Sequence, residues 1–124
     1  MSDLAELSGR LIAAYNAKDF DAMGALIAPD VDFSHYNRNF VLNSRDALLD
    51  VLRGFAASYV PDRHFEDAEM VCVVGDTVIR QAWYVGTPAV DLPGFGNAGE
   101  AFRLKFCSFM RFADGALVEW KDFG

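Results

Sequence analysis

The run AFRLKFCSFMRF, residues 101–112, constrains the fold of this chain more than any other segment. Apolar or small side chains occupy every second position from Phe102 to Phe112, and charged residues such as Arg103 and Lys105 lie between them. Side chains alternate between the two faces of a strand, so this period of two predicts a long strand with one apolar face and one charged face. The second half of the chain is therefore interpreted as a meander of antiparallel strands.

Two further β-rich segments flank this strand. MVCVVGDTVIRQAWYV, residues 70–85, contains two runs separated by a Gly-Asp turn of the kind that hairpins prefer. After Phe112, an Asp-Gly turn leads into ALVEWKDF, residues 116–123, which predicts a final strand. The intervening residues 86–99 are rich in Gly and Pro and long enough to form a lid or a rim.

The first half of the chain has helical periodicity. Residues 3–17 predict an amphipathic helix, and a second, shorter helix is expected from about Asp19 until Pro29 stops it. A strand is predicted over residues 31–38, followed by a third helix that ends at Pro61. The predicted buried face of this third helix comprises Leu48, Leu52, Phe55 and Tyr59.

Three helices followed by long strands indicate an α+β domain, in which helices pack on one face of a curved antiparallel sheet. With 124 residues the chain forms one domain. A strongly bent sheet would enclose a cavity, but periodicity alone allows a ligand-binding barrel and a two-layer sandwich equally.

Charge and cysteine usage narrow the possible partners. A net charge of −7 without a basic cluster disfavours nucleic acid and membrane surfaces, so a neutral or apolar small ligand is expected. The first ten residues lack a basic stretch followed by an apolar run, and a cytoplasmic location is expected. Cys72 and Cys107 lie in apolar runs, which predicts buried free thiols, and their spacing fits no zinc site.

Two strings carry a family resemblance. YNAKDFDAMGALIAPDVDF, residues 15–33, combines a helix ending in Asn-Ala-x-Asp, a short helix, and an Ala-Pro-Asp-Val entry to a strand. ADGALVEWKDF, residues 113–123, has the pattern of a closing hairpin. On these strings the chain resembles the NTF2-like superfamily, which includes SnoaL-like polyketide cyclases, ketosteroid isomerases and limonene epoxide hydrolases. The resemblance implies a single SnoaL-like domain over residues 1–124, an NTF2-like cone of three helices on a strongly curved, mixed or antiparallel sheet that encloses a pocket.

The resemblance also implies roles for particular positions. His35 falls where ketosteroid isomerases carry the aspartate that moves the proton, and an imidazole suits this task because its unperturbed pKa is near neutrality. The isomerase oxyanion hole falls on Leu11 and Ser108, so a steroid isomerase is not expected. The three charged residues of the epoxide hydrolases correspond to Ala82, Tyr84 and Asp122, of which only the last is charged here.

Four polar residues are expected inside the cone: His35, Tyr84, Ser108 and Asp122. Asp122 is predicted to accept a hydrogen bond from His35, which would fix the imidazole tautomer and raise its basicity. Tyr84 and Ser108 would donate hydrogen bonds to developing negative charge. The predicted function is an enzyme without cofactor or metal that performs isomerisation, cyclisation or dehydration on an apolar cyclic or polyketide-like substrate.

The expected substrate-binding residues are Tyr15, Phe33, Tyr59, Phe106, Met110 and Trp120. These residues suit a hydrophobic core equally well, and a histidine on an apolar face is more often a satisfied core residue than a catalyst. A non-catalytic module that binds a hydrophobic ligand or serves as a dimeric scaffold is therefore the alternative, and an epoxide hydrolase is a weaker one. A homodimer is implied by the resemblance, through an outer sheet face that carries Arg103, Lys105, Phe109 and Arg111.

Overall fold

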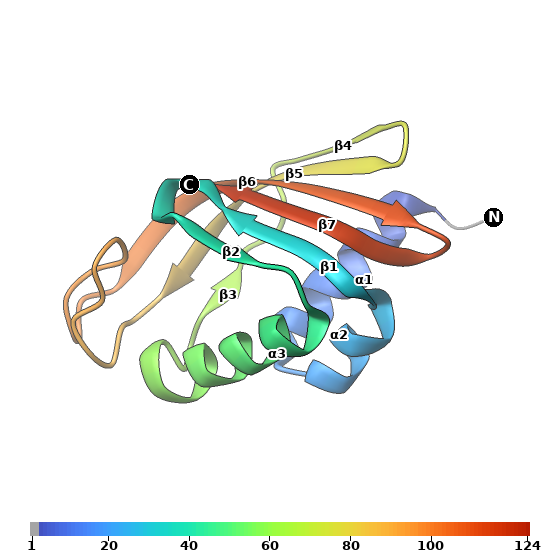
Figure 1. Ribbon diagram of the computed structural model, residues 1–124. Helices are drawn as coiled ribbons and strands as arrows, with labels where there is room; N and C mark the ends of the chain where they lie inside the picture. The colour runs from blue at the N-terminus through green and yellow to red at the C-terminus, as the bar shows by residue number, and fades with distance from the viewer. Residues whose placement is uncertain (1–2) are drawn as a thin grey trace.

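Three helices cover the concave face of a curved sheet in the computed structural model, which describes residues 3–124 (Figure 1). The helices are α1, Leu4–Ala17; α2, Phe20–Leu26; and α3, Arg45–Gly54, which continues as one π-helical turn over Phe55–Tyr59. No described helix is long and apolar enough to cross a membrane.

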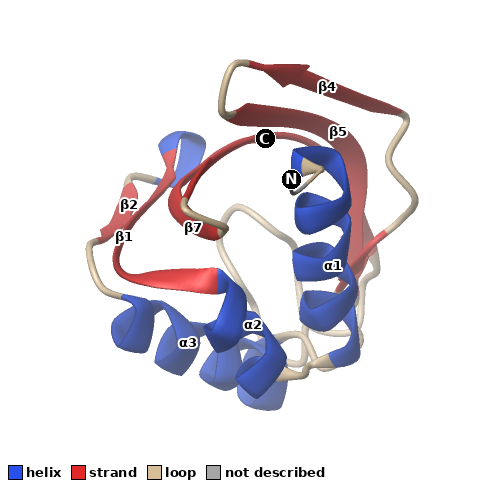
Figure 2. Cartoon of the chain, turned by 90° about the vertical axis from the view of Figure 1, so that its right-hand side faces the viewer, coloured by secondary structure: helices blue, strands red, loops and turns tan. Residues whose placement is uncertain are grey.

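The sheet contains seven strands: β1, Ile27–His35; β2, Phe40–Leu42; β3, His64–Phe65; β4, Met70–Val74; β5, Thr77–Gly86; β6, Phe102–Ala113; and β7, Ala116–Phe123. Their order is β2-β1-β7-β6-β5-β3, and β4 also pairs with β5. The neighbours β1 and β7 are parallel and the other pairs are antiparallel, so the sheet is mixed. Figure 2 shows this sheet curving around the helices, which confirms the α+β cone predicted from the sequence.

Side chains at the helix starts satisfy the first backbone amides. The Asp3 carboxylate accepts from the amide of Ala5 at 3.0 Å, and the Ser44 hydroxyl accepts from the amide of Ala47 at 3.2 Å. Such caps contribute about 1 kcal/mol each, because helix termini otherwise leave amide groups without partners. They stabilise the first turns of α1 and α3, at the residues where these helices begin.

Strand β1 begins and ends earlier than the predicted span of 31–38. It starts at Ile27, directly after α2, and ends at His35, where a single 3₁₀ turn begins. The pairing of β1 with β7 is irregular between Ile27 and Asp32. Pro29 lies within this irregularity and has no amide hydrogen to donate to a ladder. Pro29 therefore interrupts the strand pairing and does not mark the end of α2.

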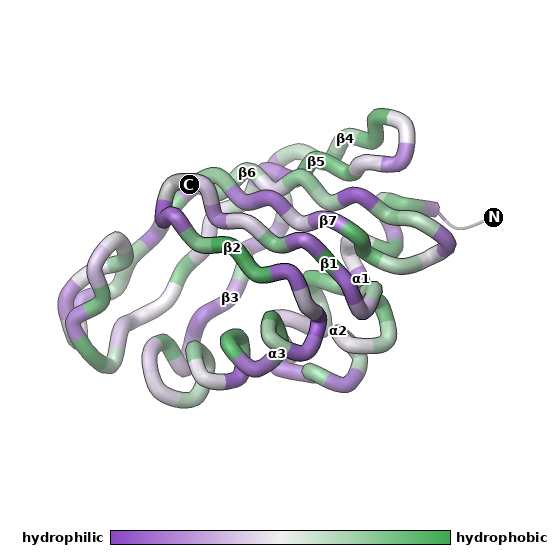
Figure 3. The backbone as a smooth tube through the Cα atoms, viewed as in Figure 1, coloured by the Kyte–Doolittle hydropathy of each residue, from purple (hydrophilic) through white to green (hydrophobic). Residues whose placement is uncertain are grey.

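Strand β6 has the predicted alternation in burial, with its more buried residues at every second position. In Figure 3 the strands of the sheet carry both hydrophobic and hydrophilic segments. Phe106 and Met110 are buried, whereas Arg103 and Lys105 are exposed. Burying a side chain of this size stabilises the fold by roughly 1.5–3 kcal/mol. The turns that bound β6 and β5 use Gly115 and Gly75 at positive φ, as two-residue hairpin turns require.

Two expectations about burial are wrong. Tyr59 is 45% exposed, because α3 widens into the π-helical turn and the 3.6-residue spacing that predicted its buried face is lost. Cys72 is exposed, because β4 pairs only with β5 and all five of its residues are solvent-exposed. Both cysteines are free thiols, as expected.

Candidate functional site

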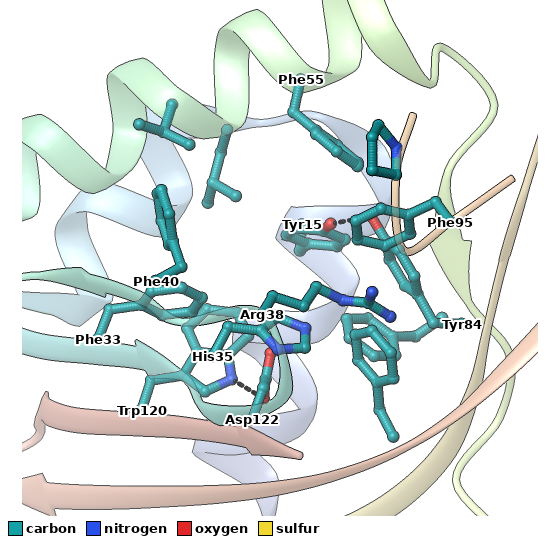
Figure 4. Close-up of a pocket in the computed structure, with 15 residues that line it drawn as sticks. Tyr15, Phe33, His35, Arg38, Phe40, Phe55, Tyr84, Phe95, Trp120 and Asp122 are labelled. Atoms are coloured by element: carbon teal, nitrogen blue, oxygen red, sulfur yellow. Dashed lines mark hydrogen bonds between the residues drawn. The ribbon is translucent and has the colours of Figure 1, made fainter. Parts of the chain in front are cut away.

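A pocket of about 250 Å³ opens between the concave sheet face and α3 (Figure 4). Most of its lining is apolar or aromatic, and the polar side chains that reach it are few. The lining residues named below are Tyr15, Phe33, His35, Arg38, Tyr84, Pro93, Phe95, Phe106, Trp120 and Asp122. An apolar pocket with a few converging polar groups is the usual form of a small-molecule site.

Aromatic rings form the walls of the pocket. The Tyr84 ring stacks on Phe106 with centroids 5.0 Å apart and an interplanar angle of 18°. The Phe33 ring meets Trp120 edge-on, with centroids 5.5 Å apart and an angle of 83°. Aromatic contacts of this kind favour particular ring orientations, so the walls of the pocket are preformed.

His35 lies at the end of β1, directly opposite Asp122 in the parallel pairing of β1 with β7. It is 8% exposed, and neither ring nitrogen has a hydrogen-bond partner among the described residues. Burial lowers the pKa of His35 to about 4, and the positive charge of Arg38 acts in the same direction. At neutral pH the imidazole is therefore uncharged.

Asp122 is 4% exposed and also lines the pocket. Burial raises the pKa of Asp122 to about 6, against hydrogen bonds from the Ser108 hydroxyl and the Trp120 indole, which lower it. The indole Nε1 donates to Asp122 Oδ1 at 2.7 Å. The expected hydrogen bond from His35 is not formed: the carboxylate accepts from Trp120 and Ser108, and neither ring nitrogen of His35 has a partner among the described residues.

Two tyrosine hydroxyls meet across the pocket. The Tyr15 and Tyr84 oxygens are 2.7 Å apart, and either can be the donor. Burial raises the pKa of Tyr15 to about 12, opposed by the positive charge of Arg63, and it raises the pKa of Tyr84 well above the usual value. Both phenols are therefore protonated at neutral pH. One hydroxyl proton bridges the pair, and the other is not used within the pair.

Seven of the ten predicted site residues line this pocket: Tyr15, Phe33, His35, Tyr84, Phe106, Trp120 and Asp122. Ser108 and Met110 are buried on the inner face of β6 but do not line it. Ser108 lies behind Asp122, its partner in the β6–β7 pairing. Met110 is fully buried within the hydrophobic core. Tyr59 is exposed and outside the pocket.

Two arginines were not predicted as part of the site. Arg38, on the 3₁₀ turn Tyr36–Arg38, lines the pocket beside His35. Arg63 is 1% exposed, and its guanidinium lies 3.7 Å from the Tyr15 ring centroid, behind the tyrosine pair. Periodicity gives no signal for either, because both lie outside regular helices and long strands. The Gly- and Pro-rich segment does contribute Pro93 and Phe95 to the pocket wall, so it forms part of the rim.

Comparison with known proteins supports the family indicated by this geometry. The fold resembles a candidate polyketide cyclase from Pseudomonas putida KT2440, with a TM-score of 0.86 and 20% identity over 100% of this chain and 92% of that one. A candidate polyketide cyclase from Xanthomonas campestris pv. campestris has a TM-score of 0.84 and 22% identity over 98% and 89% of the two chains. An LEH-like epoxide hydrolase from M. tuberculosis has a TM-score of 0.77 and 14% identity over 97% and 80%.

Identities this low show a shared fold and leave the reaction open. No curated protein sequence matches the chain. The family model of the SnoaL-like domain matches residues 9–120, which is nearly the whole chain. The protein therefore belongs to the SnoaL-like domain family of the NTF2-like superfamily.

Proposed function

We propose that this protein is a cofactor-independent enzyme that moves protons on an apolar cyclic or polyketide-like substrate held in the cone pocket. One observation supports the proposal: His35, uncharged at neutral pH and without a hydrogen-bond partner in the described part of the chain, is paired across β1 and β7 with Asp122, a buried carboxylate whose pKa is about 6. Ionisable groups with perturbed pKa values in an apolar pocket are typical of acid–base catalysts.

Asp122 is the general base in this proposal. With a pKa of about 6 it is mostly ionised at neutral pH, yet it is a far stronger base than an ordinary aspartate. His35, with a pKa of about 4, is too weakly basic for the role that the resemblance implied. Its uncharged ring has one N–H donor, so its role is to donate a hydrogen bond to the substrate oxygen.

The chemical step follows from these roles. Asp122 takes a proton from the carbon next to a substrate carbonyl, and the C–H electron pair becomes an enolate. His35 and the free hydroxyl of the Tyr15–Tyr84 pair donate hydrogen bonds to the enolate oxygen, where negative charge develops. Return of the proton to a different carbon gives isomerisation. Attack of the enolate carbon on a second carbonyl gives cyclisation, in which the alkoxide that forms takes the proton back from Asp122. Loss of a β-hydroxyl, which leaves as water with the returned proton, gives dehydration.

A non-catalytic ligand-binding role is the second candidate. It is favoured by the hydrogen bonds that the polar groups make to each other, since Asp122 is held by Trp120 and Tyr15 by Tyr84. An epoxide hydrolase is less well supported, because Asp122 is the one carboxylate among the described lining residues. Sedimentation at assay concentration tests the associated expectation of a homodimer.

Proton abstraction can be measured without knowing the natural substrate. The assay incubates α-tetralone, an apolar bicyclic ketone, with the protein in D₂O and follows deuterium incorporation next to the carbonyl by NMR. Wild type is expected to accelerate exchange, and Asp122→Asn to lower this rate by about 10²–10⁴-fold. His35→Gln is expected to slow exchange less, because it loses one hydrogen bond to the enolate. Asp67→Asn, an exposed carboxylate outside the pocket, is the matched control.

The outcomes separate the two candidates. Ketone binding, measured by the change in tryptophan fluorescence in a Trp83→Phe background that leaves Trp120 as the one tryptophan, supports the ligand-binding role if exchange is not accelerated. Equal exchange rates in wild type and Asp122→Asn remove Asp122 from the mechanism. Panels of enones, hydroxyketones and epoxides, assayed with the same variants, then identify the net reaction.

A further inference from the structure

We propose that the buried Arg63 is a positioning residue that acts through Tyr15, and that it makes Tyr15 the member of the Tyr15–Tyr84 pair that donates a hydrogen bond to the substrate oxygen. The inference rests on the proposed function, in which this pair faces the oxygen where negative charge develops. Arg63 is 1% exposed and does not line the pocket, so it acts through the side chains that it contacts.

The guanidinium of Arg63 lies against one face of the Tyr15 ring. Its central carbon is 3.7 Å from the ring centroid, which is well within the range of a cation–π contact. Nη1 of the same guanidinium donates a hydrogen bond to the backbone carbonyl of Tyr15. Ring and backbone of one residue therefore share the same positive charge.

Neighbouring contacts hold Arg63 in this place. Arg63 directly precedes β3, whose second residue is Phe65. The side-chain amide of Asn16 donates to the carbonyl of Phe65 at 2.9 Å, and its oxygen accepts from the amide of Phe65 at 2.9 Å. These two bonds tie β3 to the last turn of α1, which carries Tyr15. The charge is thus in position before any substrate binds.

No carboxylate offsets this charge at close range. None of the ion pairs within residues 3–124 includes Arg63, and its Nε and Nη2 have no hydrogen-bond partner there. Arg103, in contrast, pairs with Glu66 at 2.8 Å on the outer side of the sheet. Because water is excluded around Arg63, its charge acts on Tyr15 more strongly than a surface charge would.

The two phenols of the pair respond differently. Burial raises the pKa of Tyr15 to about 12, and the charge of Arg63 is the largest of the influences that lower it. Burial raises the pKa of Tyr84 well above the usual value, and Arg63 opposes this less. The hydrogen bond between the hydroxyls lowers the pKa of Tyr15 and raises that of Tyr84. Tyr15 is therefore the stronger acid and the better hydrogen-bond donor.

This order of acidity assigns a role to each member of the pair. The Tyr15 hydroxyl donates to the enolate oxygen, and the Tyr84 hydroxyl donates to the Tyr15 oxygen, 2.7 Å away (Figure 4). As the enolate forms, the Tyr15 oxygen becomes more negative, and Arg63 stabilises this charge from behind the ring. The stabilisation grows only as the charge develops, so it raises kcat more than it strengthens substrate binding.

The first measurement needs no turnover. Trifluorotyrosine, which ionises at lower pH than tyrosine, is placed at position 15 by amber suppression, and its ionisation is followed by absorbance while the other tyrosines stay protonated. Arg63→Met should raise the pKa of this residue by about one unit or more, as expected for the loss of an adjacent opposite charge. Arg63→Lys should raise it less, because the charge is kept. Arg103→Met, which removes an equal charge from the outer sheet face, should leave it unchanged.

The second measurement is deuterium exchange into α-tetralone. Arg63→Met should lower kcat by about 3–10-fold and leave KM nearly unchanged. The variant leaves the Tyr15 carbonyl with a donor, since the amide of Lys18 also donates to it at 3.1 Å. Tyr15→Phe should lower kcat more than Tyr84→Phe does. In a Tyr15→Phe background, Arg63→Met should cause no further loss, because its effect passes through the Tyr15 hydroxyl, whereas a merely structural role would still lower the rate.

An unchanged pKa at position 15 in Arg63→Met overturns the inference, and so does a loss of kcat that persists in the Tyr15→Phe background. A larger loss from Tyr84→Phe than from Tyr15→Phe overturns it as well. If Arg63→Met fails to fold, Arg63→Gln replaces it with the same expected results. Wild type that does not accelerate exchange refutes the proposed function, and the titration then still decides whether Arg63 sets the acidity of Tyr15.

Discussion

The substitution Asp122→Asn should increase the free energy of unfolding, relative to wild type, more at neutral pH than at acid pH. The reason is that it removes a buried negative charge while it preserves the shape of the side chain. The pKa of Asp122 is raised from 3.8 to about 6 in the folded protein. The protonated carboxyl therefore favours folding below pH 3.8, and this contribution is lost as the pH rises through 6. A change from 3.8 to about 6 corresponds to about 3 kcal/mol, of which about 2 kcal/mol falls between pH 4 and pH 7.

The measurement is urea unfolding of wild type and Asp122→Asn at several pH values, followed by circular dichroism. The free energy of unfolding of the variant minus that of wild type should rise by about 2 kcal/mol from pH 4 to pH 7. His35 titrates in both proteins, so its own effect largely cancels in this difference. The exposed Asp67→Asn is the control, since it changes the net charge equally without touching the pocket.

A pH-independent difference between wild type and Asp122→Asn would refute this reasoning. It would mean that the carboxylate is solvated in the folded protein, and the raised pKa on which the role of Asp122 as a base depends would be lost with it. The expected result is a stability–activity conflict, in which the variant is more stable at pH 7 and less active.

Three further predictions follow from the same geometry. The NMR chemical shifts of the His35 ring protons should change with a midpoint at about pH 4, and a midpoint near 6.5 would contradict the burial of this side chain. The contribution of His35 to the stability of the fold should therefore be present above pH 6.5 and be lost as the pH falls through 4. Tyr15→Phe or Tyr84→Phe should each cost about 1–2 kcal/mol by leaving a buried hydroxyl unpaired, and the double variant should cost less than the sum in a double-mutant cycle. Met110→Ala should cost about 2–5 kcal/mol of stability with little effect on ligand affinity, because Met110 is fully buried in the core. Tyr59→Ala should change stability by less than about 0.5 kcal/mol, because Tyr59 is exposed. Thermal melts measure the stability and calorimetry measures the ligand affinity.

Local patterns predicted the elements well where the period is regular. The alternation of β6 and the turn after Phe112 gave the correct strand and hairpin, because both depend on residues adjacent in sequence. The span of β1 was displaced and β2 was not predicted, since a three-residue edge strand has too few positions to show a period. Tyr59 was misplaced because a π-helical turn breaks the spacing on which its prediction relied.

The resemblance placed His35 and Asp122 in one pocket, but their roles depend on surroundings that no short pattern contains. Burial, the charge of Arg38 and the Trp120 hydrogen bond together set which of the two is the stronger base. These contributions come from β1, the 3₁₀ turn and β7, which meet only in the folded chain.

The sequence by itself determined the α+β class, the helices and long strands, the family, and the inward-facing side of each strand, because side-chain direction follows from backbone period. Only the tertiary structure decided the environment of each polar group. It paired β1 with β7 across most of the chain length, left both nitrogens of His35 without hydrogen-bond partners among residues 3–124, and brought Arg38 to the pocket. The physical reason is that desolvation and electrostatic interactions depend on distances in space, which the order of residues along the chain does not specify.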